Sequence, residues 1–343
     1  MKLKIKSNKA TDPISAPKNL RRDQAKAAKK EKGEKKADKV IALSPSAVVF
    51  ATYLLLLLSK IIDITLINRE NEYFSIVILQ IMIFILPGAA WCIFNGEKFV
   101  SGLRIRMPSA ASLPLMLSGA FLLSSGIILI SLLFGGLDSL SGSFSLYDTF
   151  VSKSNGELSG FVYLIMAYAV LPAICEEFVY RGILCHEYER GGVLRAILLS
   201  STFFACLHFD LRNFPVYLFG GIVLALTLYA TRSLIGSMIV HFLYNLFGLF
   251  GQPYMNTLYN ITGSTTLFVF VVAVVFLVSA AIFCSCASRL YKTYLYKSYS
   301  AEYRLPIVKS ADKIKESYIS VLKDPFTISS LAVYIIALFI SWL

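Results

Sequence analysis

The chain has 343 residues, of which 56% are hydrophobic and 16% charged, and its mean hydropathy is +0.66. Soluble domains carry charge on about a quarter of their residues, so this composition argues against a soluble protein. The formal net charge is +12, and most of it lies in one short part of the chain.

That part is the N-terminal tail. Residues 1–40 hold 14 Lys and Arg against 5 Asp and Glu, a net charge of +9, and no aromatic residue. We therefore predict a disordered, solvated tail over residues 1–44. Such a tail either lies against anionic lipid on the cytoplasmic side or only sets the topology, and we do not expect it to bind nucleic acid.

Nine apolar stretches follow the tail. A helix needs about 20 mostly apolar residues to cross a hydrocarbon core of about 30 Å. The stretches are 46–68, 74–95, 111–134, 160–188, 193–209, 214–231, 234–250, 265–287 and 327–343. The last stretch is short, so it either spans the membrane or lies at the membrane interface. The predicted fold class is an all-α, polytopic transmembrane helix bundle of about eight or nine spans.

Lys and Arg are concentrated in alternate loops between these stretches. The basic loops are 96–110, 189–192, 232–233 and 288–326, whereas the loops 69–73, 135–159, 210–213 and 251–264 hold only Arg69, Lys153 and Arg212. By the positive-inside rule, this asymmetry predicts a cytoplasmic N-terminus. Loop 288–326 is predicted to be either an amphipathic surface helix or a solvated connector.

These features divide the chain into four parts. They are the tail at 1–44, two N-terminal helices at 45–110, a core at 111–264, and C-terminal helices with a basic cytoplasmic loop at 265–343.

Ionisable side chains at membrane depth are costly and mark functional sites. Glu176 and Glu177 are adjacent in the predicted helix 160–188. Glu177 is four residues before Arg181, so the two can pair along one helix face. Glu176 then points elsewhere without a local cation, which suits a general base. A structural ion pair is an equally good interpretation of Glu177 and Arg181.

Two of the three histidines also fall in apolar helices. Phe204 and His208 are four apart in one predicted helix, and His241 and Asn245 are four apart in another. The third histidine, His186, falls near a helix end and is interpreted as interfacial.

Hydrolysis of an amide needs an activated water and a stabilised oxyanion. Glu176 and His208 can hold and deprotonate the water, and His241 and Asn245 can donate hydrogen bonds to the oxyanion. Alternatively, Glu176, His208 and His241 can bind zinc, because two histidines and a glutamate form a known catalytic ligand set. The spacing does not decide between a metal-bound and a metal-free water.

The motifs Glu176-Glu177-x-x-x-Arg181, Phe204-x-x-x-His208 and His241-x-x-x-Asn245 resemble those of the CAAX-protease and bacteriocin-processing family, also called CPBP or Abi. The resemblance covers about residues 112–250. It implies an intramembrane endopeptidase with an intramembrane catalytic cavity, similar to a CAAX prenyl endopeptidase, in which Glu176 and His208 activate water while His241 and Asn245 hold the oxyanion. Its substrate is expected to be a membrane-associated peptide or protein, and the Lys-rich chain suggests a bacterial cell membrane.

Two other functions remain open. A catalytically silent scaffold or bacteriocin-immunity protein would have no evident need for costly buried charges. A proton-coupled transporter would be expected to show inverted repeats, and none is visible in the sequence.

Overall fold

A computed structural model describes residues 44–65, 77–135, 158–296 and 311–342, to which all structural statements below refer. The predicted basic tail therefore lies outside the described residues, apart from Ser44, and so do parts of the loops at 135–159 and 288–326. The described helices belong to one compact unit, Pro45–Leu343.

The described residues form helices joined by turns and short loops, and none of them lies in a strand. In chain order the elements are α2 (Ser46–Thr65), η2 (Ile81–Ile85), α4 (Leu86–Asn95), α5 (Glu97–Gly102), α6 (Leu113–Gly135), α9 (Leu158–Ile165), η4 (Met166–Val170), α10 (Leu171–Glu177), η5 (Phe178–Leu184), α11 (Cys185–Tyr188), α12 (Val193–Leu207), α13 (Phe214–Thr231), α14 (Leu234–Thr262), α15 (Thr265–Tyr296), α16 (Ala311–Leu322) and α17 (Pro325–Trp342). Each of the nine predicted spans corresponds to one of these helices or to a continuous series of them.

By length and apolar character, six of the described helices can cross a membrane, and the bent pair α16–α17 is a seventh if it counts as one span. The helices starting at Ser46 and Val193 are apolar but shorter. The protein is thus a polytopic helical membrane protein, as predicted.

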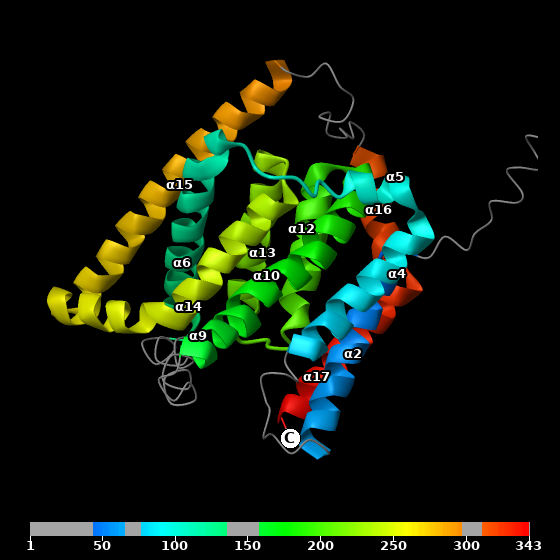
Figure 1. Ribbon diagram of the computed structural model, residues 1–343, viewed down its shortest axis with the longest axis horizontal. Coiled ribbons are helices and arrows are strands. Elements are labelled where there is room, and N and C mark those ends of the chain that lie inside the picture. Colours follow the sequence, from blue (N-terminus) through cyan, green and yellow to red (C-terminus); the bar gives the residue numbers. More distant parts are fainter. Residues whose placement is uncertain (1–43, 66–76, 136–157, 297–310, 343) are drawn as a thin grey trace, which may run out of the picture. The chain divides into compact units, whose positions relative to one another are not determined.

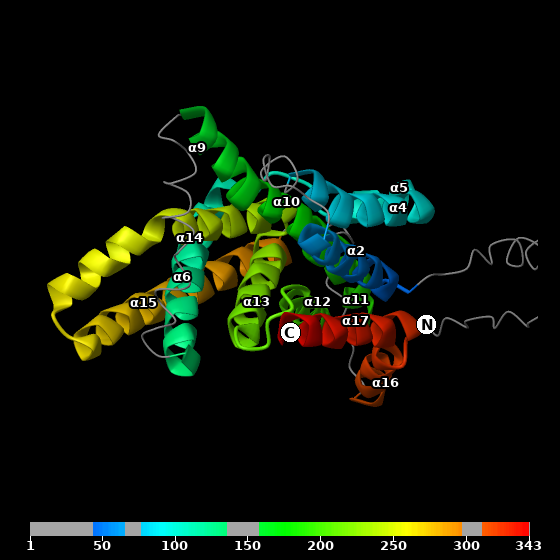
Figure 2. The same cartoon turned by 90° about the horizontal axis from the view of Figure 1, so that it is seen from below.

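Helices from opposite ends of the chain pack together. α2 packs against α17 along one side of the bundle, and α6 packs against α15 along the other (Figure 1). The helices α10, α12 and α13 lie between these two pairs, while α14 starts among them and extends past α6 (Figures 1 and 2). One apolar cluster joins α2, α12 and α17, and another joins α6, α13, α14 and α15.

Two helices continue beyond the predicted spans. α14 was expected to end near residue 250 but continues to Thr262, and α15 was expected to end near 287 but continues to Tyr296. The predictions ended where the apolar run ends, whereas α14 itself stops at Gly263, whose φ of 64° ends a helix in the left-handed conformation. α16 confirms a helix within the predicted loop 288–326.

Two π-helical segments come just before prolines. η2 is followed by Pro87 and η4 by Pro172, each at the second position of the next α-helix. A proline ring in a continuous α-helix clashes with the carbonyl four residues earlier, and a π-turn widens the backbone at that point. Side chains bind the carbonyls of η4: Gln80 donates to Ala167 and Asn245 donates to Ala169.

α12 has 15 residues, so it is about 22 Å long and shorter than a hydrocarbon core of about 30 Å. It ends at Leu207, with His208 as its C-cap residue, and α13 begins at Phe214. The short length of α12 therefore leaves His208 inside the bundle instead of carrying it to the far surface.

The close contact between α12 and α13 depends on Gly221. A Cβ atom at this position would lie 2.9 Å from the Cα of Ser201, which cannot move without moving α12. We expect Gly221→Ala to destabilise the protein by about 1–3 kcal/mol, because it forces two packed helices apart. Thermal unfolding in detergent measures this. Gly220→Ala is the matched control, since its Cβ would lie 3.8 Å from a Leu123 methyl group. Equal midpoints for both variants would contradict the prediction.

Candidate active site

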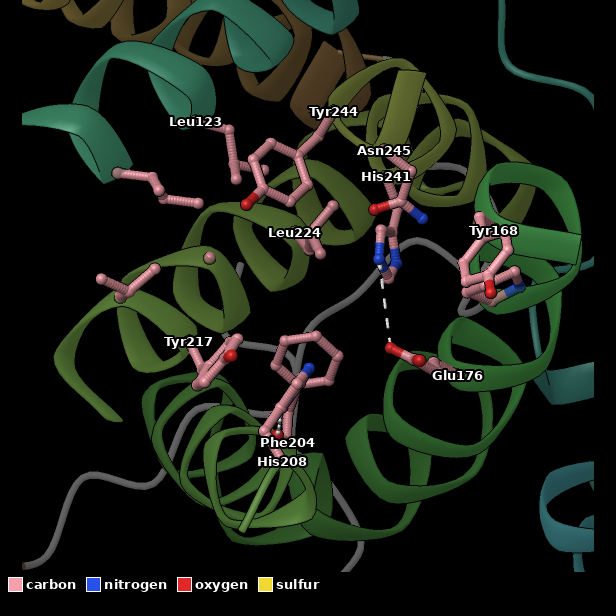
Figure 3. Close-up of a pocket in the computed structure, with 14 residues that line it drawn as sticks. Leu123, Tyr168, Glu176, Phe204, His208, Tyr217, Leu224, His241, Tyr244 and Asn245 are labelled. Atoms are coloured by element: carbon pink, nitrogen blue, oxygen red, sulfur yellow. Dashed lines mark hydrogen bonds and ion pairs between the residues drawn. The ribbon is translucent and has the colours of Figure 1, made fainter. Parts of the chain in front are cut away.

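A cavity of about 210 Å³ lies inside the bundle, between the two apolar clusters (Figure 3). α6, α12, α13 and α14 contribute to its wall, together with the helix that carries the glutamate pair. Five of the predicted site residues line it: Glu176, Phe204, His208, His241 and Asn245. The structure thus brings together residues from three separate helices, as the motifs predicted.

The two adjacent glutamates have different surroundings. The Glu176 side chain is 15% exposed and points into the cavity, while that of Glu177 is 0% exposed and lies behind the wall. The Oε1 atom of Glu177 lies 2.8 Å from Nη1 of Arg181. This distance confirms the ion pair predicted between these two residues, which are four apart in the chain. Glu177 is therefore held in an ion pair, whereas Glu176 can reach a molecule in the cavity.

Arg181 is buried together with its partner. Its Nη2 donates to the carbonyl of Gly221 at 3.1 Å, and its guanidinium lies 4.3 Å from the centre of the Phe204 ring. A buried ion pair needs such additional partners, because both charges have lost their water. Phe204 thus links the second motif to the ion pair of the first.

His241 lies between the two glutamates. Its Nδ1 is 3.1 Å from Oε1 of Glu177, and its Nε2 is 4.0 Å from Oε2 of Glu176 (Figure 3). Glu177 is ionised in its pair with Arg181 and can only accept, so Nδ1 of His241 carries a proton. Nε2 is then an acceptor when His241 is neutral and a donor when it is a cation. Glu177 therefore fixes the orientation of this ring.

Ser237 completes the surroundings of Glu177. Its hydroxyl donates to Oε2 of Glu177 and also lies 3.0 Å from the carbonyl of Leu224. Ser237 was not among the predicted site residues, although it lies four residues before His241 and so on the same face of α14. That spacing was the signal that could have found it.

His208 lies across the cavity from Glu176 (Figure 3). Its Nδ1 is 3.0 Å from the carbonyl of Phe204, which can only accept, so Nδ1 is the donor. The neutral ring then presents Nε2 as a base. The ring is stacked on Tyr217, with 3.7 Å between the ring centroids and 9° between the planes. The sequence contained no spacing signal for Tyr217, because it comes from a different helix.

Asn245 lies one turn after His241 and also lines the cavity. Its Nδ2 donates to the carbonyl of Ala169 at 3.3 Å, within the π-helical segment η4. The amide group has two N–H donors, so the second remains for a ligand. Tyr168 and Tyr244 also line the cavity, and our sequence analysis did not identify either of them.

A zinc site would require Glu176, His208 and His241 to converge. Among the residues that the structure describes, no three His, Cys, Asp or Glu side chains are grouped so that they could hold a metal ion. His208 is instead turned onto the carbonyl of Phe204 and stacked on Tyr217. These three residues do not fit a zinc site in this arrangement.

The fold and the cavity define a polytopic membrane protein in which carboxylate, imidazole and amide groups line a cavity inside a helix bundle. Residues 158–247 match the family model described as type II CAAX prenyl endopeptidase Rce1-like. This segment contains all three motifs, so the central part of the chain is similar to the CAAX-protease family over these residues. No curated protein and no solved structure matches the chain.

Proposed function

We propose that the protein is an intramembrane endopeptidase that hydrolyses peptide bonds of membrane-associated peptides or proteins. The observation that carries this proposal is the position of Glu176 in the cavity, across from the base nitrogen of His208, while Glu177 is engaged by Arg181. One carboxylate is thus available for chemistry while its neighbour supports the site. The match to the Rce1-like family model supports the same reaction class.

The nucleophile is a water molecule between Glu176 and His208. It donates hydrogen bonds to the carboxylate of Glu176 and to Nε2 of His208, and its lone pair attacks the peptide carbonyl carbon. As the new C–O bond forms, the water proton passes to Glu176. General bases of this kind contribute about 10²–10⁴-fold to a rate.

The carbonyl oxygen becomes negatively charged in this step. His241 as a cation donates its Nε2–H to this oxygen, and the second amide N–H of Asn245 donates as well. Both donors are held in advance, His241 by Glu177 and Asn245 by Ala169. Donors that need no reorganisation are the most effective at stabilising an oxyanion.

The tetrahedral intermediate then collapses. The C–N bond breaks, and Glu176 gives the proton it received to the leaving amine nitrogen. Glu176 returns to its ionised form, and the products are a carboxylic acid, which keeps the second water proton, and an amine. The acid proton then passes to the amine, which leaves a carboxylate and an ammonium ion. The cycle therefore consumes one water and needs no other reactant.

We also propose an orientation of the chain in the membrane and a cellular location. The distribution of Lys and Arg among the loops supports a cytoplasmic N-terminus, with the basic tail near anionic lipid. The Lys-rich chain suggests a bacterial cell membrane. The substrate reaches the cavity as a membrane-associated segment.

Hydrolysis in ¹⁸O-labelled water tests the proposal. The purified protein is incubated in detergent and in proteoliposomes with a library of membrane-proximal peptides, and mass spectrometry detects products. We expect each new C-terminal carboxylate to carry one ¹⁸O atom, and Glu176→Ala to yield no product. Absence of product in both settings would favour a silent scaffold or a transporter, and equal cleavage by Glu176→Ala would reject the assigned base.

Removal of metal is the second arm of this test. Because Glu176, His208 and His241 do not form a ligand set, we expect hydrolysis at an unchanged rate after exhaustive chelation. A loss of activity that added zinc restores, but added magnesium does not, would show that these side chains rearrange around a metal.

A further inference from the structure

The turn directly after α12 has an uncommon backbone conformation. Phe209, the residue that follows His208, has a φ of 49°, in the left-handed region. A bulky side chain rarely adopts this conformation unless its surroundings impose it. Its backbone N–H still donates to the carbonyl of Cys206 at 3.1 Å, so the turn remains bound to the end of α12.

The ring of Phe209 is held by helices from both ends of the chain. Phe209 is 4% exposed, and its ring meets Tyr53 of α2 edge-on at 5.7 Å and Tyr334 of α17 at 6.2 Å. The ammonium group of Lys60 in α2 lies 5.2 Å from the ring centre. α2 and α17 thus enclose one side chain of the turn that carries His208.

α2 also contacts the last turns of α12 directly. The hydroxyl of Tyr53 donates to the carbonyl of Phe203. The next residue, Phe204, supplies the carbonyl that accepts from His208. α2 therefore holds the backbone that orients the imidazole directly, through Tyr53. Both α2 and α17 also hold it indirectly, through the ring of Phe209.

We propose that Tyr53, Phe209 and Tyr334 are positioning residues for His208. By clamping the Phe209 ring, α2 and α17 keep the turn in its left-handed conformation and hold the imidazole flat against Tyr217, with Nε2 toward the cavity. Both helices lie outside residues 158–247, which match the family model. The catalytic consequence rests on the function proposed for His208, but the geometric consequence does not.

Chemical modification of the histidines tests the geometric part without any substrate. The chain has three histidines, so carbethoxylation by diethyl pyrocarbonate can be followed separately for each by peptide mass spectrometry. We expect Phe209→Ala and Tyr334→Ala to speed the modification of His208 severalfold, because the ring leaves its stack. His186, which lies against Phe99 in another part of the bundle, is the internal reference and should react at an unchanged rate.

Two further variants separate positioning from loss of packing. Phe326→Ala loosens the same pair of helices through its contact with Phe50, at 6.2 Å, and should leave His208 at its wild-type rate. Tyr334→Phe keeps the ring and should restore the wild-type rate that Tyr334→Ala has lost. Tyr53 and Tyr334, which hold the Phe209 ring from α2 and α17, form the clamp. If Phe209→Ala does not fold, Tyr334→Ala still removes one side of this clamp.

The kinetic arm links the clamp to catalysis. We expect Phe209→Ala to lower kcat by about 10²-fold with KM little changed, the size of effect that a displacement of about 1 Å produces. In a His208→Ala background the same change should cost nothing further, because it acts only through His208.

The two arms distinguish the possible failures. If the wild type hydrolyses peptides but Phe209→Ala and Tyr334→Ala change neither kcat nor His208 reactivity, the clamp is rejected and the proposed function stands. If His208 reactivity responds as expected but the wild type shows no hydrolysis, the clamp stands and the proposed function fails.

Discussion

Replacing Glu176 by glutamine is expected to lower kcat for peptide hydrolysis by about 10²–10⁴-fold, with KM and thermal stability close to those of the wild type. Glutamine has the shape of glutamate but cannot accept the water proton. Among the described residues Glu176 makes no ion pair closer than 4.0 Å, so little of the described fold depends on its charge. Steady-state kinetics on a cleaved peptide, together with a thermal midpoint in detergent, measure both quantities.

Glu177→Gln is the matched comparison, because it makes the same chemical change one residue away. It removes the charge that pairs with Arg181 and accepts from His241. We expect this variant to lose thermal stability as well as activity. If Glu177→Gln instead keeps its stability and loses all activity, while Glu176→Gln remains active, the assignment of the two glutamates must be reversed.

The second large effect is expected at Arg181. Arg181→Met leaves the Glu177 carboxylate buried without its cation, and breaking a buried ion pair in this way costs about 3–5 kcal/mol. Both side chains of the pair are 0% exposed, so water cannot replace the missing partner. We expect a lower yield of folded protein and a lower thermal midpoint, measured by size-exclusion chromatography after heating in detergent.

Two controls make the Arg181 result specific. The double variant Arg181→Met with Glu177→Gln should recover part of the lost stability, because no unpaired charge remains. Arg190→Met removes an arginine that also pairs with a glutamate, Glu187 at 2.9 Å, but its side chain is 69% exposed, so the expected cost is below about 1 kcal/mol. Equal losses at Arg181 and Arg190 would contradict the role given to the buried pair.

The transmembrane helices could be predicted from the sequence because the signal is local. The length of an apolar run decides whether a helix can cross the hydrocarbon core, and all nine predicted positions are helical in the part of the chain that the structure describes. The ends were less predictable. α14 passes the last apolar residues of its span and stops only where Gly263 takes the left-handed conformation.

The composition of the site was also predictable, because each motif lies on one helix. Residues four apart share a helix face, so the pairing of Glu177 with Arg181 and the common direction of His241 and Asn245 followed from spacing. The same spacing reaches Ser237, which we did not identify.

Contacts between different helices could not be predicted in this way. The stacking of Tyr217 on His208, the place of His241 between the two glutamates, and the contact of α2 and α17 with Phe209 all join residues far apart in the chain.

The sequence by itself determined the membrane class, the helices and the reactive groups on each of them. Only the tertiary structure decided which side chains line one common cavity, which nitrogen of each histidine is occupied, and which side chains hold the histidines in place. The physical reason is that helix formation and spacing depend on neighbours within one or two turns. The direction of a side chain toward a cavity depends instead on how whole helices pack, as at Gly221, where the lack of a Cβ atom lets α13 approach α12.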